Sequence, residues 1–132
     1  MCARSDNDRQ AHSPRRLLDH PILGPLPPAA TVHFILDGMP VAGRAGEPIV
    51  AALLATGIRV FRTMPRFGEA RGGYCLVGRC SDCLITVDGI TNVRACLEPV
   101  REGASVVTQR GIGSWSSALD GSVGSEPMDR PA

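Results

Sequence analysis

The stretch Cys75-Leu-Val-Gly-Arg-Cys80-Ser-Asp-Cys83, with Cys96 after twelve intervening residues, decides how this chain is interpreted. Its spacing, Cys-x4-Cys-x2-Cys with a fourth cysteine further on, is typical of a loop that presents thiolates to a [2Fe-2S] cluster. Two irons bridged by two sulfides need four outer ligands. The sequence therefore predicts a [2Fe-2S] centre whose ligands are Cys75, Cys80, Cys83 and Cys96.

Glycines make such a tight loop possible. Gly72, Gly73 and Gly78 lie in the loop or just before it, where glycine adopts positive φ angles without a steric penalty. The same geometry leaves backbone N–H groups free to face sulfur atoms. We expect the fourth ligand, Cys96, to come from the end of a strand that returns from a hairpin.

Three other uses of the cysteines are less favoured. A structural zinc site usually has two Cys-x2-Cys pairs or Cys/His pairs, whereas only one such pair is present here. Disulfides need an oxidising compartment, and cysteines in one glycine-rich loop are poorly separated for bridging. A Rieske centre needs two histidine ligands, but His12, His20 and His33 all lie far upstream of the cysteines.

Length and composition predict one small domain with two tails. Residues 1–30 contain five prolines and no periodicity, so we expect a flexible N-terminal tail. Residues 31–110 form the compact domain, and residues 111–132 form a Gly/Ser-rich C-terminal tail. A domain of roughly eighty residues has a marginal apolar core and commonly uses a metal centre as a staple.

Charge and hydropathy limit the binding partners and the cellular compartment that we expect for the protein. Fourteen basic and thirteen acidic residues give a formal net charge of +1, which provides no electrostatic argument for nucleic-acid binding. No run of eighteen apolar residues is present, so no membrane span is predicted. Arg15 and Arg16 superficially resemble a twin-arginine export signal, but residues 19–28 are too charged and proline-rich for its apolar region. We expect a cytoplasmic protein, whose thiols stay available to iron.

The first half of the domain reads as a hairpin and a helix. Residues 31–36 are rich in β-branched and aromatic side chains, Asp37-Gly38 supplies a turn, and the return strand begins at Met39. A helix follows, with Pro48 at its first position and Gly57 as its stop. This order is typical of a β-grasp domain, so the predicted fold class is α+β.

The second half of the domain reads as another hairpin and a last strand. Residues 84–87 alternate as a strand, Asp88-Gly89 turns, and residues 91–95 return to Cys96. The third and fourth cysteines therefore stand at the two ends of one hairpin, whose register fixes their separation. The last strand is predicted at residues 105–108.

Several polar and apolar residues have more than one interpretation. Arginines in the irregular segment before the cysteine loop would raise the potential of a negatively charged cluster, form a docking rim, or simply be solvated; they are Arg59, Arg62, Arg66 and Arg71. Cys2 is expected to be an incidental exposed thiol, and His33 an edge or partner-facing group. Trp115 would anchor a partner or fold back on the domain. The tail's only apolar cluster, Ile22, Leu23 and Leu26, would suit a partner subunit.

Two stretches carry a family resemblance. They are Tyr74-Cys-Leu-Val-Gly-Arg-Cys-Ser-Asp-Cys-Leu-Ile-Thr-Val-Asp-Gly and Asn92-Val-Arg-Ala-Cys-Leu-Glu-Pro-Val-Arg-Glu-Gly103. They resemble the small [2Fe-2S] subunits of bacterial multisubunit flavin-dependent amine dehydrogenases, the group of D-hydroxyproline dehydrogenase, opine oxidase and hydrogen cyanide synthase. The resemblance covers about Thr31 to Gly111. It implies a β-grasp, plant-type ferredoxin-like domain in which the four cysteines bind the iron.

The same resemblance implies larger partner subunits. These would hold FAD, often with FMN, and would oxidise the C–N bond of an amino acid, imino acid or opine. The chain itself would have no catalytic residues. A flavin takes two electrons as a hydride, whereas a [2Fe-2S] centre passes one at a time, so the predicted function is to relay single electrons from flavin towards an acceptor.

Three rival functions stay open. A free-standing ferredoxin usually has a more distant fourth cysteine and a markedly acidic surface. The iron–sulfur subunit of a molybdenum hydroxylase carries a second cluster with four more cysteines, but this sequence has only Cys2 to spare. A cluster-free interaction module would be colourless when purified.

Overall fold

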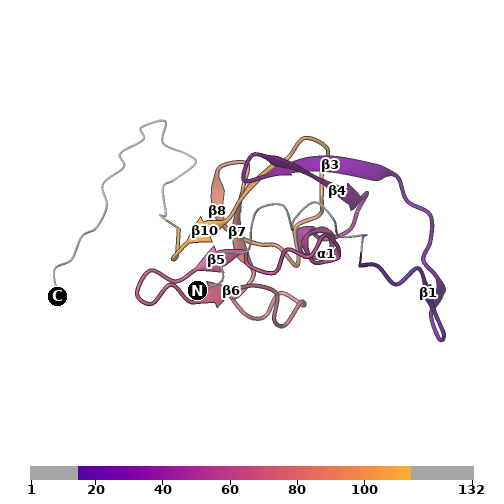
Figure 1. Cartoon of the computed structure of the whole chain (residues 1–132), viewed down its shortest axis with the longest axis horizontal. Coiled ribbons are helices and arrows are strands. Elements are labelled where there is room, and N and C mark those ends of the chain that lie inside the picture. Colours follow the sequence, from indigo (N-terminus) through magenta and orange to yellow (C-terminus); the bar gives the residue numbers. More distant parts are fainter. Residues whose placement is uncertain (1–14, 114–132) are drawn as a thin grey trace, which may run out of the picture.

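Two β-hairpins flank a central strand, and one helix packs against the sheet that they form. The structure, a computed structural model, describes residues 15–113. Its main sheet has the strand order β4-β3-β9-β7-β8 (Figure 1). β3 (Thr31–Leu36) and β4 (Met39–Arg44) form one antiparallel hairpin, and β7 (Leu84–Val87) and β8 (Ile90–Arg94) form the other. β9 (Ser105–Val107) lies between them, parallel to β3 and antiparallel to β7, as in the predicted β-grasp.

Both hairpin turns are those that the sequence predicts. Asp37 and Gly38 have φ angles of 48° and 82°, and Asp88 and Gly89 have φ angles of 49° and 81°. Positive φ at both central residues matches the right-handed twist of the flanking strands, and Asp-Gly is a preferred pair for such turns.

The helix is short and ends where a glycine allows it. α1 (Ile49–Ala55) begins one residue later than predicted, because Pro48 has an extended backbone and acts as the N-cap. At the other end Gly57 has a φ of 86°; its N–H bonds to Leu54 O, and the N–H of Ile58 bonds to Leu53 O. This pair of bonds is a Schellman motif. No helix within residues 15–113 is long and apolar enough to cross a bilayer.

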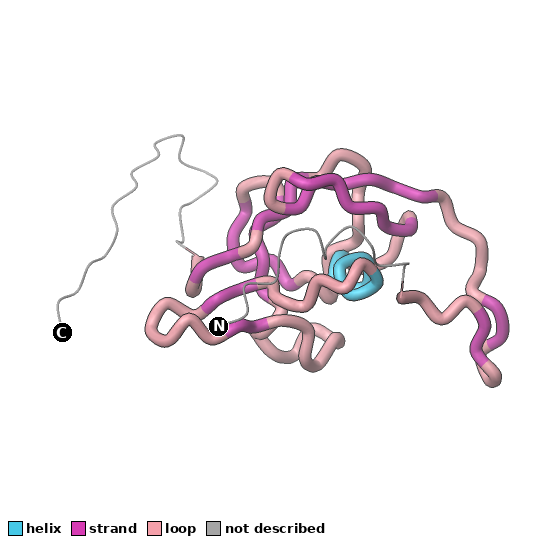
Figure 2. Tube along the Cα trace, in the orientation of Figure 1, coloured by secondary structure: helices cyan, strands magenta, loops and turns pink. Residues whose placement is uncertain are grey.

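One face of α1 packs against the main sheet, as the tube in Figure 2 shows. The buried side chains come from the helix, both hairpins and β9. They include Phe34, Leu36, Val41, Ile49, Leu53, Ile85, Val87 and Val106, together with Cys83 and Cys96. Two of the predicted ligands are therefore also core residues.

The segment before the cysteine loop is less irregular than expected. β5 (Arg62–Thr63) and β6 (Ala70–Arg71) pair with each other, and β10 (Gln109–Arg110) pairs with β5. The prediction of an irregular segment was wrong here, because two-residue strands leave no periodicity in the sequence. This small sheet lies directly before the cysteine loop in the chain.

The N-terminal segment contacts the domain. β1 (Asp19–His20) and β2 (Gly24–Pro25) form a small hairpin that projects from it at the right of Figure 1. The N–H of Arg15 bonds to Ala55 O at 2.8 Å, and the Arg16 guanidinium makes two 2.5 Å bonds to the Glu47 carboxylate. Flexibility of the tail stays a prediction, and Cys2 and Trp115 lie outside the described residues.

Turn aspartates hold both ends of β9. Asp37 accepts the N–H and hydroxyl of Thr108 at 2.8 and 2.5 Å, and Asp88 accepts the N–H of Ser105 at 2.8 Å. The same two residues also donate their own N–H groups to Val106 O and Ser105 O. Two hairpin turns thus fix the position of the strand that joins the hairpins.

We predict that Asp37→Ala lowers the free energy of unfolding by about 2 kcal/mol, since two hydrogen bonds are lost and alanine is disfavoured at positive φ. Asp37→Asn should cost less, because asparagine tolerates this φ and keeps one oxygen acceptor. Chemical denaturation of the cluster-loaded protein measures both. Asp19→Ala, at an exposed position in β1, is the control; an equal effect of Asp19→Ala and Asp37→Ala would contradict the role of Asp37.

Candidate metal centre

The four cysteines converge from a loop and a hairpin. Cys75 and Cys80 lie in the loop after β6 and are half-buried, whereas Cys83 and Cys96 are only 1% and 5% exposed. Cys83 precedes β7 and Cys96 follows β8. The N–H of Ala95 bonds to Cys83 O at 3.1 Å, so the open end of the hairpin brings these two cysteines together as predicted. All four thiols are free.

Backbone N–H groups point at the first sulfur. The N–H groups of Arg79 and Cys80 both lie 3.3 Å from Cys75 Sγ. Bonds from the backbone of Cys80 and Val77 lower the pKa of the Cys75 thiol from its ordinary 9.0 to about 6. The curled loop therefore favours a thiolate at this position, which is the form that binds metal.

The buried thiols have the opposite character. Burial raises the pKa of the Cys83 thiol, and the neighbouring thiols of Cys96 and Cys80 raise it further, although the N–H of Cys96 acts against them. Cys83 thus adjoins Cys96 and Cys80, and the Cys80 side chain in turn bonds to Cys75. These interactions link the thiols pairwise, from Cys75 through Cys80 and Cys83 to Cys96.

This donor set fits a diiron centre. Four soft thiol ligands with N–H donors directed at sulfur are the environment that an iron–sulfur cluster uses. Within residues 15–113, no group of three or more His, Cys, Asp or Glu side chains is arranged to hold a metal ion by itself. Instead, the Cys75 thiol has the Cys80 thiol as its neighbour, and the Cys83 thiol has the Cys96 thiol. His33 lies on β3 and His20 on β1, away from the cysteine loop in the chain.

Glycines in the loop have two different roles. Gly78 has a φ of 76°, and a Cβ there would lie 2.7 Å from Leu97 Cδ1, so the prediction for this residue is confirmed. Gly72 and Gly73 are not at positive φ. They allow close approach instead: a Cβ on Gly72 would lie 2.0 Å from Arg59 O. Leu76 unexpectedly takes a positive φ of 59°.

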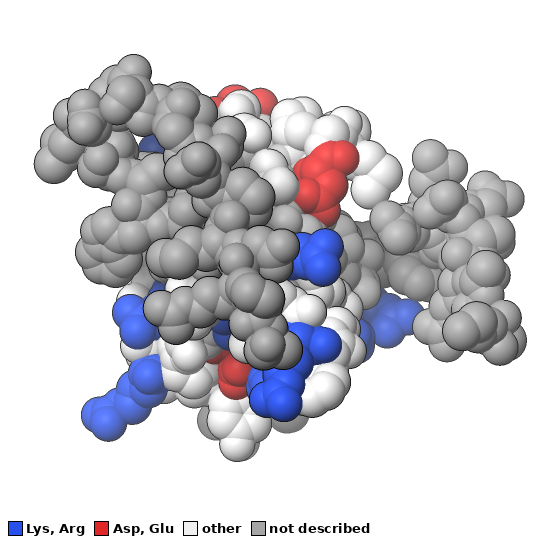
Figure 3. All heavy atoms as spheres, turned by 90° about the vertical axis from the view of Figure 1, so that its left-hand side faces the viewer, with Lys and Arg blue, Asp and Glu red and all other residues white. Residues whose placement is uncertain are grey.

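Arginines hold the carbonyl side of the loop. Arg62 donates to Ser81 O at 2.8 Å, and Arg94 Nε donates to Cys80 O at 3.1 Å. Arg71 lies 3.7 Å from the Asp82 carboxylate. Sequence reasoning selected Arg62 and Arg71 but missed Arg94, although its position two residues before Cys96 was a usable signal. Figure 3 shows arginines gathered on the side of the molecule at the left of Figure 1, with few carboxylates between them.

The comparisons with known proteins agree with this centre. A family model described as a 2Fe-2S iron-sulfur cluster binding domain matches residues 29–111. The chain belongs to this family. Its members' cofactor and the predicted α+β ferredoxin-like fold are thereby confirmed for this [2Fe-2S] domain, whereas the identity of its ligands is argued from the sulfur geometry alone.

Two curated relatives of the [2Fe-2S] domain are both named hydrogen cyanide synthase subunit HcnA. The protein from Pseudomonas aeruginosa (strain PAO1) is 40% identical over 79 residues, which are 60% of this chain and 73% of the relative. The protein from Pseudomonas protegens (strain CHA0) is 37% identical, over 60% of this chain and 74% of the relative. The predicted resemblance to this group is confirmed.

A solved structure supports the fold. The crystal structure of L-proline dehydrogenase from P. horikoshii matches with a TM-score of 0.54 and 24% identity. The match covers 63% of this chain but only 16% of that chain. The matched part of this chain therefore corresponds in fold to a small part of a much longer polypeptide there.

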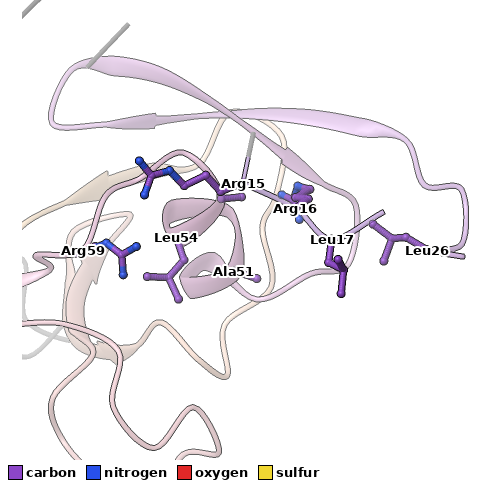
Figure 4. Close-up of a pocket in the computed structure, with 8 residues that line it drawn as sticks. Arg15, Arg16, Leu17, Leu26, Ala51, Leu54 and Arg59 are labelled. Atoms are coloured by element: carbon purple, nitrogen blue, oxygen red, sulfur yellow. The ribbon is translucent and has the colours of Figure 1, made fainter. Parts of the chain in front are cut away.

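A separate cavity of about 390 Å³ lies between the N-terminal segment and the helix (Figure 4). Its lining comes from the N-terminal segment, from α1 and from the residue range that follows α1: Arg15, Arg16, Leu17, Leu26, Ala51, Leu54, Ala55 and Arg59. None of the four cysteines lines it. The lining has no carboxylate, thiol or imidazole side chain.

We predict that Cys75 is more reactive than Cys83 in the cluster-free protein. Its lowered pKa makes it a thiolate above about pH 6, and alkylation should slow as the pH falls below that value. Cys83, whose pKa is raised, is the internal control and should react little. Iodoacetamide labelling across this pH range, read by peptide mass spectrometry, measures both. A Cys75 pKa at the ordinary thiol value of 9.0 would contradict the loop geometry.

Proposed function

We propose that Cys75, Cys80, Cys83 and Cys96 hold the cluster of an electron-transfer subunit in a multisubunit flavoprotein dehydrogenase or oxidase. The complex would act on an amino acid, imino acid or opine in the cytoplasm, and its larger subunits would hold FAD and, in some members, FMN. The names of the two Pseudomonas relatives, which are subunits of a synthase, support membership of a complex. This chain contributes no catalytic residue.

The observation that carries the proposal is an apolar surface at the cysteine loop, here named the cluster collar. It consists of the residues Tyr74, Leu76, Val77 and Leu97, which are 80%, 46%, 67% and 61% exposed. Leu97 lies against Gly78, and Leu76 lies near Gly73, so the collar follows the loop itself. Apolar and aromatic groups grouped in this way are typical of a surface that a partner covers.

The collar also lies on the side from which electrons would leave. Cys75 and Cys80 are half-buried and belong to the same loop, whereas Cys83 and Cys96 are buried in the core. A bound [2Fe-2S] cluster accepts and releases one electron at a time. The collar residues would exclude water from this exposed side once a flavin-containing subunit docks there.

The rest of the loop is built to stay in place. N–H groups from Arg79 and Cys80 orient Cys75 Sγ, and Arg62 and Arg94 hold the carbonyls of Ser81 and Cys80. Fixed donors of this kind tune a metal centre without rearranging when its charge changes. These contacts suit a relay that only gains and loses electrons.

The first test removes one ligand. Cys80→Ser should abolish or strongly perturb the visible absorption of the cluster, and it should lower substrate-driven reduction of an acceptor by the native complex. Cys2→Ser, which changes the one cysteine outside the ligand set, is the matched control and should leave both unchanged. Normal absorption and normal electron transfer in Cys80→Ser would remove the case for a relay through this site.

The second test separates a subunit from a free-standing ferredoxin. Val77→Asp in the collar should weaken association with the flavin-containing chains about tenfold or more, because burial of one large apolar side chain contributes roughly 1.5–3 kcal/mol and ~1.4 kcal/mol is tenfold in affinity. The flavin content of complexes purified through this chain measures the loss. Ile90→Asp, at a 58% exposed position beside the distant hairpin turn, is the control.

In that experiment the iron content of the Val77→Asp chain should stay normal. Unchanged flavin content would contradict the collar as the docking surface. Absence of flavin from the wild-type preparation would favour the free-standing carrier.

A further inference from the structure

Arg62 stands out among the arginines because it is buried. Its residue is 5% exposed, and within residues 15–113 only Gln109 is a comparably buried polar residue. One nitrogen, Nη2, donates to Ser81 O at 2.8 Å. Another, Nε, is buried and has no hydrogen-bond partner. A guanidinium is always charged in proteins, so this is a fixed positive charge inside the domain.

No carboxylate balances this charge in the part of the chain that the structure describes. The ion pairs of residues 15–113 involve Arg16, Arg71 and Arg101, but not Arg62. A buried charge without a counter-charge is strongly unfavourable. A negative charge beside Arg62 would therefore be stabilising, and residues 15–113 do not supply one.

The residues opposite Arg62 on the two neighbouring strands do not neutralise its charge. Arg62 on β5 is directly opposite Arg71 on β6, and directly opposed like charges destabilise a sheet. Arg71 is balanced by Glu69 at 3.5 Å and Asp82 at 3.7 Å. On the other side of β5, the register partner of Arg62 is Gln109, which is neutral. Neither neighbour provides an anion for Arg62.

The position of the guanidinium indicates where the missing anion lies. Ser81, whose carbonyl it binds, stands between Cys80 and Cys83 in the loop. A cluster with four thiolates and two sulfides has net negative charge, and charge and hydrogen bonds around it set its potential. The loop thus brings a buried cation and an anionic group to the same place.

We propose that Arg62 is the buried counter-cation of the cluster and raises its reduction potential. Reduction transfers one electron from a flavin donor, which is oxidised, and forms or breaks no bond. The negative charge at the loop increases by one, so a fixed neighbouring cation stabilises the reduced form more than the oxidised form. The inference rests on the proposed four-cysteine ligand set.

The test is a potentiometric titration of the cluster-loaded full chain, followed by visible and electron paramagnetic resonance spectra. Arg62→Gln and Arg62→Met remove the charge and should make one-electron reduction about tenfold less favourable, a fall of ~59 mV. Arg62→Lys keeps the charge and should restore most of the potential. Arg66→Gln is the matched control, because Arg66 is exposed and stacks on Phe67 with its guanidinium carbon 4.8 Å from the ring centre.

Two results would overturn the proposal. One is an unchanged potential in a neutral variant that keeps normal iron and sulfide content. The other is an equal fall in Arg62→Lys and Arg62→Gln, which would assign the effect to the Ser81 hydrogen bond and not to charge.

If neither neutral variant accumulates as folded protein, Arg62→His provides the test. Its imidazole loses its charge as the pH rises, so its potential should fall relative to that of the wild-type protein between acidic and alkaline pH; an equal pH dependence in the two proteins would overturn the proposal. Iron analysis of the wild-type protein separates the two levels of inference. A wild-type protein without a [2Fe-2S] spectrum defeats the proposed function, whereas a normal spectrum with unmoved potentials defeats only the role of Arg62.

Discussion

The register of the β7–β8 hairpin is the constraint on which the rest of the molecule depends. Leu84 pairs with Arg94, and the Ala95 N–H closes onto Cys83 O, so Cys83 and Cys96 are fixed side by side. The irregularity in this hairpin lies between Ile85 and Val87, towards the turn, and leaves the cysteine end regular. Since both cysteines belong to the hydrophobic core, the packing of the domain also sets the positions of these two proposed metal ligands.

The four sulfurs are consequently unequal. The hairpin pair is buried, with a raised pKa at Cys83, whereas the loop pair is half-buried, with a lowered pKa at Cys75. The buried pair ties the centre to the core. The loop pair belongs to the segment in which Tyr74 and Val77 are exposed, so the proposed centre would have one closed side and one side open to a partner. An electron-transfer subunit needs such an open side to exchange electrons with its partner, whereas a purely structural metal site does not need one.

Local signals explain how much could be predicted from the sequence. The cysteine spacing and the Asp-Gly turns depend on residues close together in the chain, so the [2Fe-2S] domain and both hairpins could be predicted. The small β10-β5-β6 sheet and the role of Arg94 depend on pairing between distant segments, and two-residue strands carry no pattern of their own. The same holds for Gly72, which is required by the carbonyl of Arg59 and not by its own φ.

The charges around the loop connect folding to metal binding. All fourteen basic residues of the chain are arginines, and two of them, Arg62 and Arg94, donate to consecutive carbonyls inside the cysteine loop. Within residues 15–113, the Arg62 guanidinium is buried and forms no ion pair. With the proposed ligand set, metal binding would release the thiol protons and would supply negative charge near this guanidinium. The free energy of metal binding would then contribute to folding, as in other small metal-dependent domains. The buried arginine and the thiols, which destabilise the domain without a cluster, would thus stabilise the domain that holds one.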